Sequence, residues 1–248
     1  MKKIILALIL SLGVMPVFAV EDTKPAKDIT VDEIPEPPQM QSGKSLVNKV
    51  AGAQPNFPAK YTYEYIEKIK PQYKCVGKEE IFYVALDMLK NTTGDFSRLA
   101  ILGNNLTEKP VKIEFKNLSE INKDYAEFDA LGWKKGKRLY IYINPRHKDA
   151  PAGAIAALLS HEALHQDEYN SLAEETYAWT MEAAVWCEIL NEYPEMGDDK
   201  MHPLVVREDT LKKLFEKGNY TDKYIKKTVS QNKGYQNLPS TSPGFEKL

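Results

Sequence analysis

Hydrophobic positions at the start of the folded part recur with helical spacing. Residues 60–70 carry one apolar face, and Pro71 is expected to end this helix, because a proline forces the preceding residue out of the helical region. A second, buried helix is predicted over residues 78–94, where acidic residues come early, a lysine comes late and a glycine stops the pattern. The apolar face of the first helix consists of Tyr61, Tyr65, Ile66 and Ile69.

The pattern then changes from helical spacing to alternation. Three short runs rich in β-branched and aromatic residues, separated by turn-like segments, are predicted to be strands. They cover residues 111–116, 125–131 and 138–144. Short strands joined by short turns indicate a small, largely antiparallel sheet.

Helical spacing returns in the second half of the chain. A long helix is expected to begin at Pro151, with Asp149 as its N-cap, and to run through an apolar body into His161. The next helix, from Leu172 to about Leu190, is apolar around most of its circumference and should be buried on several sides. Two more helices are predicted over residues 203–217 and 221–231. Together the elements predict an α+β fold with N-terminal helices, a small sheet and C-terminal helices.

The N-terminus has the layout of a secretory signal peptide over residues 1–19. Two lysines precede an apolar run from Ile4 to Val14, and cleavage is expected after the small residue Ala19. The run is shorter than the roughly 20 apolar residues that span a bilayer, so no stable membrane anchor is expected after cleavage. A short uncleaved anchor is the alternative. The chain is therefore expected to be exported, to the periplasm or the exterior of a bacterium.

Composition divides the rest of the chain into three parts. Residues 20–58 are rich in proline and charge and poor in large apolar side chains, which predicts a disordered linker. One folded domain is expected over residues 59–232, followed by a flexible polar tail over residues 233–248. Loss of Lys2 and Lys3 with the signal peptide takes the formal net charge from −2 to −4, and no basic stripe stands out. A nucleic-acid partner is therefore not expected.

The two cysteines, Cys75 and Cys187, allow two interpretations. In an oxidising compartment they could form a disulfide, which would stabilise the fold by closing a long loop. The other interpretation is a pair of buried free thiols. The spacing in sequence leaves both open, because the Cα separation decides between them.

The stretch SHEALH contains two of the four histidines, four positions apart. On a helix these positions share a face, so His161 and His165 can direct ring nitrogens to one point. A catalytic zinc site takes three protein ligands, with imidazole at about 2.0 to 2.1 Å, and keeps one position open. Glu162, about 100° around the helix, would lie beside that position and could pass a proton from zinc-bound water to a leaving amine. A histidine pair without metal is the alternative.

A third metal ligand must come from elsewhere in the chain. Glu174 and Glu175 stand nine and ten residues beyond His165, across a short turn and at the start of the next predicted helix. A helix hairpin of this length brings the start of the second helix back toward the end of the first. Either carboxylate could close a site for one Zn²⁺ per chain.

These residues resemble the gluzincin metallopeptidases, the HExxH class that includes thermolysin, in the compact minigluzincin form. The resemblance covers residues 77–190 and implies a zincin-like fold with an HExxH helix and a second, ligand-bearing helix. It favours Glu175 as the third ligand, because members of the class often have a small residue three positions later. Ala178 fits that pattern, whereas Glu174 has Tyr177 at the same spacing.

The chain departs from the class at the residue that supports a histidine. Where many members place an aspartate four positions after the ligand glutamate, this sequence has Trp179. Glu174 or Glu182 is left to take that supporting role.

Two features concern substrate binding. The predicted strand at residues 138–144 directly precedes the HExxH helix; it is either an edge strand that pairs with an extended peptide or a core strand that only packs. Zinc peptidases also use a side chain that polarises the scissile carbonyl. The candidates are Tyr220, Tyr224, His202, Arg146 and His147, each with an ordinary surface or capping role as its alternative.

We therefore expect an exported zinc-dependent metallopeptidase that hydrolyses a peptide or protein substrate. The expected metal ligands are His161, His165 and Glu175, and the expected catalytic residue is Glu162. One alternative is a non-catalytic exported binding or interaction domain that zinc stabilises. Another keeps the same site and hydrolyses cell-wall peptide crosslinks.

Overall fold

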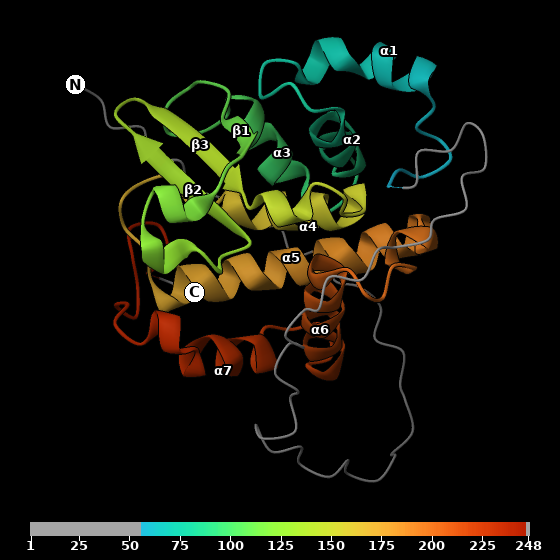
Figure 1. The fold of residues 1–248 in the computed structure, drawn as a ribbon. Coiled ribbons are helices and arrows are strands. Elements are labelled where there is room, and N and C mark those ends of the chain that lie inside the picture. Colours follow the sequence, from blue (N-terminus) through green and yellow to red (C-terminus); the bar gives the residue numbers. More distant parts are fainter. Residues whose placement is uncertain (1–55, 247–248) are drawn as a thin grey trace, which may run out of the picture. The chain divides into compact units, whose positions relative to one another are not determined.

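Residues 56–246 are described by the computed structural model (Figure 1). The predicted signal peptide and nearly all of the predicted linker lie outside the described residues. The described part is an α+β fold with seven α-helices and one three-stranded sheet, in agreement with the predicted class. The helices are α1 Tyr63–Tyr73, α2 Glu80–Met88, α3 Asp95–Leu102, α4 Ala152–Glu162, α5 Leu172–Glu192, α6 Pro203–Lys217 and α7 Lys223–Gln231, and the strands are β1 Lys112–Phe115, β2 Ala130–Lys135 and β3 Arg138–Ile143.

Strand order in the sheet is β1-β3-β2, and the sheet is mixed. β2 and β3 form an antiparallel hairpin through a two-residue turn, in which Gly136 has φ of +60° as tight hairpin turns require. β1 pairs with the opposite side of β3 and runs parallel to it, so the expectation of a largely antiparallel sheet is wrong for this pair. β3 is the central strand, so residues 138–144 are a core strand and not an edge that could pair with a peptide.

The second strand lies later in sequence than predicted. Tyr125 ends a short 3-10 helix, and residues 126–129 are turn and loop. The strand occupies 130–135, including most of a segment that looked like a turn. The ring of Phe128 stacks on Tyr125 at 5.1 Å and stays 42% exposed, so its apolar character does not indicate a sheet position. Trp133 pairs instead with Tyr140 across the hairpin.

The N-terminal helices also differ from the predicted boundaries. α1 continues through Pro71 to Tyr73, which is fully buried and donates a hydrogen bond to Asp87 at 3.1 Å. The tertiary contact keeps the last turn helical despite the proline. The predicted helix at residues 78–94 ends at Met88, and a separate helix, α3, begins at Asp95 without having been predicted.

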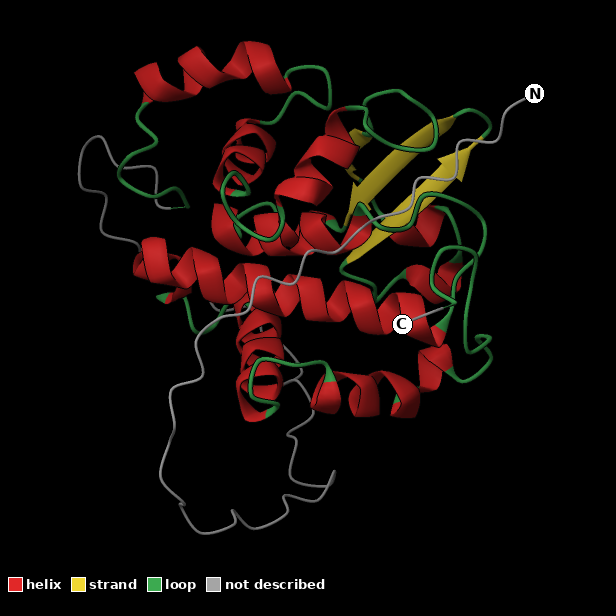
Figure 2. Ribbon diagram, turned by 180° about the vertical axis from the view of Figure 1, so that it is seen from behind, coloured by secondary structure: helices red, strands yellow, loops and turns green. Residues whose placement is uncertain are grey.

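α4 is the centre of the fold, and all eleven of its residues are buried. It packs against α2, α3 and β2 on one side and against α5 on the other (Figures 1 and 2). Each fully buried aliphatic side chain, such as Leu158 or Leu159, contributes about 1.5–3 kcal/mol to stability. The expected cap Asp149 points into solvent, and the first N–H of the helix, from Ala152, donates instead to the carbonyl of Asn56 at 2.8 Å.

The C-terminal helices agree with their predicted spans, but the tail does not behave as a loose segment. The N–H groups of Leu172 and Ala173, in the first turn of α5, donate to the carbonyls of Pro239 and Ser240 at 2.9 and 3.1 Å. The side chain of Ser242 is buried. The tail therefore completes the N-terminal end of α5.

Both cysteines are free thiols in the structure, as in the second interpretation, but both are half-buried and not fully buried. Burial raises the pKa of Cys187 to about 11, so this thiol stays protonated and unreactive. Within residues 56–246 no helix is both long enough and apolar enough to cross a membrane.

Close packing of α4 on α5 leads to a stability prediction at Gly153. A Cβ added there would lie 2.8 Å from Cγ2 of Ile189 and 3.1 Å from Cβ of Met196. We expect Gly153→Ala to lower the free energy of unfolding by about 1–3 kcal/mol, although alanine favours helix. Urea denaturation measures this change. In an Ile189→Ala background, Gly153→Ala should lower the free energy of unfolding by less, or raise it. The same loss of stability in both backgrounds would show that the contact with Ile189 is not its cause.

Candidate metal centre

The two histidines of the motif come from the end of α4 and the turn that follows it. α4 ends at Glu162, and His165 lies three residues later, where the N–H groups of Leu164 and His165 donate to the carbonyls of His161 and Glu162 at 3.0 and 3.3 Å. The expectation that both histidines lie on one helix is therefore wrong for His165. The tightened turn still places the two rings on one side, with centroids 5.2 Å apart.

Glu175, in the first turn of α5, faces both histidines. Its Oε2 is 3.8 Å from Nε2 of His161, and its Oε1 is 3.8 Å from Nε2 of His165. One ligand atom from each residue lies within 4.8 Å of the other two. Ligand atoms in a tetrahedral zinc site are separated by about 3.3 Å, so small side-chain movements would close this group on an ion.

The other nitrogen of each histidine is held by a carboxylate. Nδ1 of His161 is 2.9 Å from Oε2 of Glu182, and Nδ1 of His165 is 2.9 Å from Oε1 of Glu174. An ionised carboxylate only accepts hydrogen bonds, so each Nδ1 carries a proton and each Nε2 is the nitrogen left to face a metal ion. Both residues left for the supporting role thus take it, one for each histidine.

Two supporting residues were not predicted from the sequence. Asn170 donates to Oε1 of Glu175 at 2.6 Å, and Ser242 from the tail donates to Oε2 of Glu174 at 2.7 Å. The spacing of Ser171 and Glu174 is that of a capping box, and Oγ of Ser171 accepts from the N–H of Glu174 at 3.1 Å. The capping-box spacing could have been recognised in the sequence. The hydrogen bond from Ser242 could not, because it depends on how the tail folds back onto α5.

One oxygen of Glu175 has no hydrogen-bond partner. Oε2 is buried and makes no hydrogen bond within the described part of the chain. Burial alone would raise the pKa of Glu175, but His161, His165 and the hydrogen bond from Asn170 lower it. Burial would likewise lower the pKa of His165, while the bond to Glu174 and the charges of nearby carboxylates raise it to about 9. The carboxylates around the group thus favour a positive charge between them, which a proton on His165 or a bound cation supplies.

Glu162 lies beside this group and is held by the edge of the sheet. Its Oε2 accepts a hydrogen bond from the N–H of Gly132 on β2 at 2.6 Å, and its Oε1 lies 4.0 Å from Nε2 of His161. Burial raises the pKa of Glu162, although His161 and His165 oppose the rise. A carboxylate in this position is a stronger base than one in water.

The charge of Glu182 is offset from the opposite side. Burial alone would raise its pKa, but Arg207 and His161 lower it. Arg207 lies on α6 and was not predicted to belong to a site.

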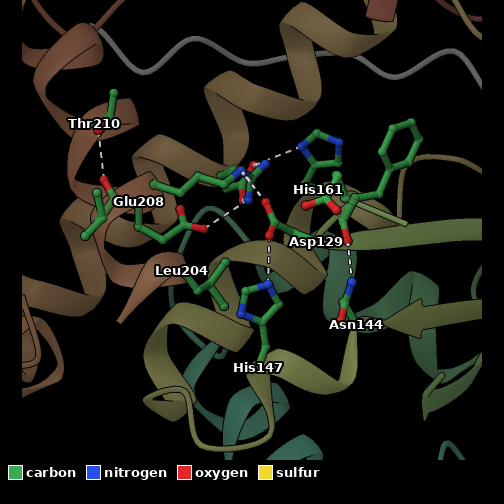
Figure 3. Close-up of polar contacts among 12 residues, drawn as sticks. Asp129, Asn144, His147, His161, Leu204, Glu208 and Thr210 are labelled. Atoms are coloured by element: carbon green, nitrogen blue, oxygen red, sulfur yellow. Dashed lines mark hydrogen bonds and ion pairs between the residues drawn. The ribbon is translucent and has the colours of Figure 1, made fainter. Parts of the chain in front are cut away.

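None of the five candidates for polarising a carbonyl contacts the three-residue group within the described part of the chain. His147 lies 2.7 Å from Oδ1 of Asp129 (Figure 3), and Arg146 donates to the same oxygen at 2.7 Å. His202 caps α6 by accepting from the N–H of Leu204. Tyr220 and Tyr224 lie near the turn between α6 and α7, against Phe215 and Lys217 respectively. An unpredicted tyrosine, Tyr235 of the tail, lies against Trp179, and its hydroxyl group helps to lower the pKa of Glu175.

The donor set can hold a metal ion. The Nε2 atoms of two imidazole rings and one buried, unpaired carboxylate oxygen converge from α4, the following turn and α5. Divalent transition metals take this combination of nitrogen and oxygen ligands. The residues present therefore fit a metal ion at His161, His165 and Glu175.

Comparison with protein-family models, with functionally characterised proteins and with solved structures finds no match to this chain.

Close approach of β2 to the motif leads to a prediction at Gly132. A Cβ added there would lie 2.8 Å from Cβ of His165 and 3.1 Å from the carbonyl oxygen of Glu162. We expect Gly132→Ala to push the strand away and to weaken binding of Zn²⁺, measured by competition with a chelator. Gly136→Ala on the same hairpin is the control, because its Cβ would meet open space and only its positive φ costs about 1 kcal/mol. Equal affinities in the two variants would show that the close approach is unnecessary.

Proposed function

We propose that this protein is an exported zinc-dependent metallopeptidase of zincin-like fold. One observation carries the proposal: with both Nδ1 atoms engaged by carboxylates, the free Nε2 atoms of His161 and His165 each lie 3.8 Å from an oxygen of Glu175. Nothing else in the described part of the chain satisfies Oε2 of Glu175. The predicted signal peptide supports export.

His161, His165 and Glu175 would hold the zinc ion. The set of two histidines and one glutamate leaves a tetrahedral ion one position for water or substrate. When bound, zinc would lower the pKa of water and polarise the carbonyl of a peptide bond.

Glu162 is the proposed general base and acid. It is within reach of the proposed zinc position, since Oε1 lies 4.0 Å from Nε2 of His161, and it is not a member of the ligand group. The N–H of Gly132 fixes one carboxylate oxygen at 2.6 Å and leaves the other to take a proton. Glu162 would then return this proton to the leaving amine.

β2 is the proposed docking strand for the substrate. β3 lies at the centre of the sheet, so β2 provides the sheet edge beside Glu162. An extended peptide that adds to this edge would present its backbone carbonyls to the site. Edge and base are brought together by the packing of β2 on α4.

A zinc-stabilised domain without catalytic activity is the second candidate, and the burial of the site favours it. His161, Glu162 and Glu175 are only 4%, 7% and 3% exposed, so a substrate reaches them only if a neighbouring segment moves. The two candidates share the metal ligands and differ in the need for Glu162.

Zinc content tests the shared part of the proposal. The full chain, purified without chelators, should contain about one Zn²⁺ per molecule by elemental analysis. His161→Ala should remove it, because the variant loses one of three ligands. His202→Ala is the matched control and should retain zinc, since His202 caps α6 and lies outside the ligand group. Absence of zinc from the parent chain, even after incubation with Zn²⁺, would end the proposal.

Hydrolysis of a fluorogenic peptide library separates the two candidates. Glu162→Gln should lower the rate by about 10²- to 10⁴-fold, because an amide cannot accept the proton, and should leave the zinc content unchanged. Glu168→Gln is the control, since this glutamate is 64% exposed and forms an ion pair with Lys134, away from the metal ligands. If the zinc-loaded Glu162→Gln variant cleaved the peptides as fast as the parent, the mechanism would be wrong. If the zinc-loaded parent cleaved no peptide, the non-catalytic domain would be supported.

A further inference from the structure

Arg207, on α6, places one guanidinium among three carboxylates from different parts of the chain. Nη2 donates to Oε2 of Glu182 at 2.8 Å, and Nη1 donates to the other oxygen of the same carboxylate. Nη1 also lies 3.3 Å from Oε1 of Glu208, and Nε lies 3.4 Å from Oδ2 of Asp129. Figure 3 shows Asp129, Glu208 and His161 around this network.

The fork on Glu182 fixes the orientation of a histidine in the proposed metal centre. Oε2 of Glu182 is shared, 2.8 Å from Nη2 of Arg207 and 2.9 Å from Nδ1 of His161. A bidentate guanidinium sets the plane of a carboxylate as well as its position. Arg207 on α6 therefore helps to set the direction in which Nε2 of His161 points, through its contact with Glu182.

The same guanidinium is tied to the sheet edge beside Glu162. Asp129 directly precedes β2 and receives hydrogen bonds from Arg146 and His147, which hold its carboxylate in place. Three residues later, Gly132 of β2 holds Glu162. Arg207 thus joins the strand that fixes the proposed base to the carboxylate that fixes a proposed ligand.

Arg207 is also the main charge partner of Glu182. The carboxylate of Glu182 is fully buried, and a buried carboxylate that loses its cation is strongly destabilised. Glu208, beside it, adds a second fully buried carboxyl group. Without Arg207, the hydrogen bond from His161 would remain, but the carboxylate of Glu182 would have no guanidinium opposite it.

We infer that Arg207 is a positioning residue of the metal centre, acting through Glu182 on His161. The inference rests on the proposed function, because it needs His161 to be a metal ligand. It adds a residue outside the HExxH motif and its supporting carboxylates, on a helix that carries none of them.

Zinc affinity of the full chain, measured by competition with a chromophoric chelator, tests this role. Arg207→Met should weaken Zn²⁺ binding by about 10- to 100-fold, the usual effect of losing an outer contact of a metal centre. Arg98→Met is the matched control: Arg98 is a partly buried arginine paired with Asp95 on α3, and its loss should lower stability without changing the zinc affinity.

Two further variants separate orientation from folding. Arg207→Lys keeps the charge but loses the fork, so it should fold and still bind zinc more weakly than the parent. Arg207→Met combined with Glu182→Gln leaves no unpaired carboxylate at position 182, and an amide oxygen can still accept from His161. The double variant should bind zinc more tightly than Arg207→Met alone. Co²⁺ in place of zinc should show an altered absorption spectrum in Arg207→Lys.

The outcomes distinguish this inference from the proposed function. A parent chain that binds no zinc overturns both. A parent that binds zinc while folded Arg207→Lys and Arg207→Met bind it equally well overturns only the role of Arg207. Equal weakening by Arg98→Met and Arg207→Met would mean that zinc affinity follows stability alone, which also overturns it.

Discussion

α5 carries three carboxylates into the interior, Glu174, Glu175 and Glu182, and each needs a partner because a bare buried carboxylate is unstable. Two of them bind the Nδ1 atoms of the histidines that follow from α4. The third lies between the two Nε2 atoms with one oxygen unpaired. Packing of α5 on α4 brings these groups together. The remaining elements supply the charges and hydrogen bonds that offset the cost of burying the carboxylates.

Local sequence features account for much of this arrangement. Apolar spacing predicts α5, α6 and α7 close to their observed ends. The residues of each helix alone form the apolar face that it buries, so the local pattern is sufficient. The motif and the short turn after it also predict that Glu174 or Glu175 faces His161 and His165, and the resemblance to gluzincins favours Glu175 of the two. A loop of that length leaves the second helix little choice but to return along the first.

Contacts between distant parts of the chain account for what the sequence does not predict. α1 passes through Pro71 because Tyr73 is anchored on Asp87, which belongs to another helix. β1 pairs with β3 and not with β2, the next strand in sequence, and no local sequence pattern predicts this pairing. Arg207 looks like any charged residue of an amphipathic helix until Glu182 and Asp129 are placed beside it.

Ser242 and Glu174 stand 68 residues apart, and their hydrogen bond has a consequence for how the protein is made. A chain that emerges N-terminus first holds both histidines and all of α5 long before the segment that steadies Glu174 exists. The hydrogen-bond shell of His165 is thus completed only after Ser242 has been synthesised. Until then a nascent chain carries this cluster of carboxylates and imidazoles without the hydrogen bond that holds Glu174.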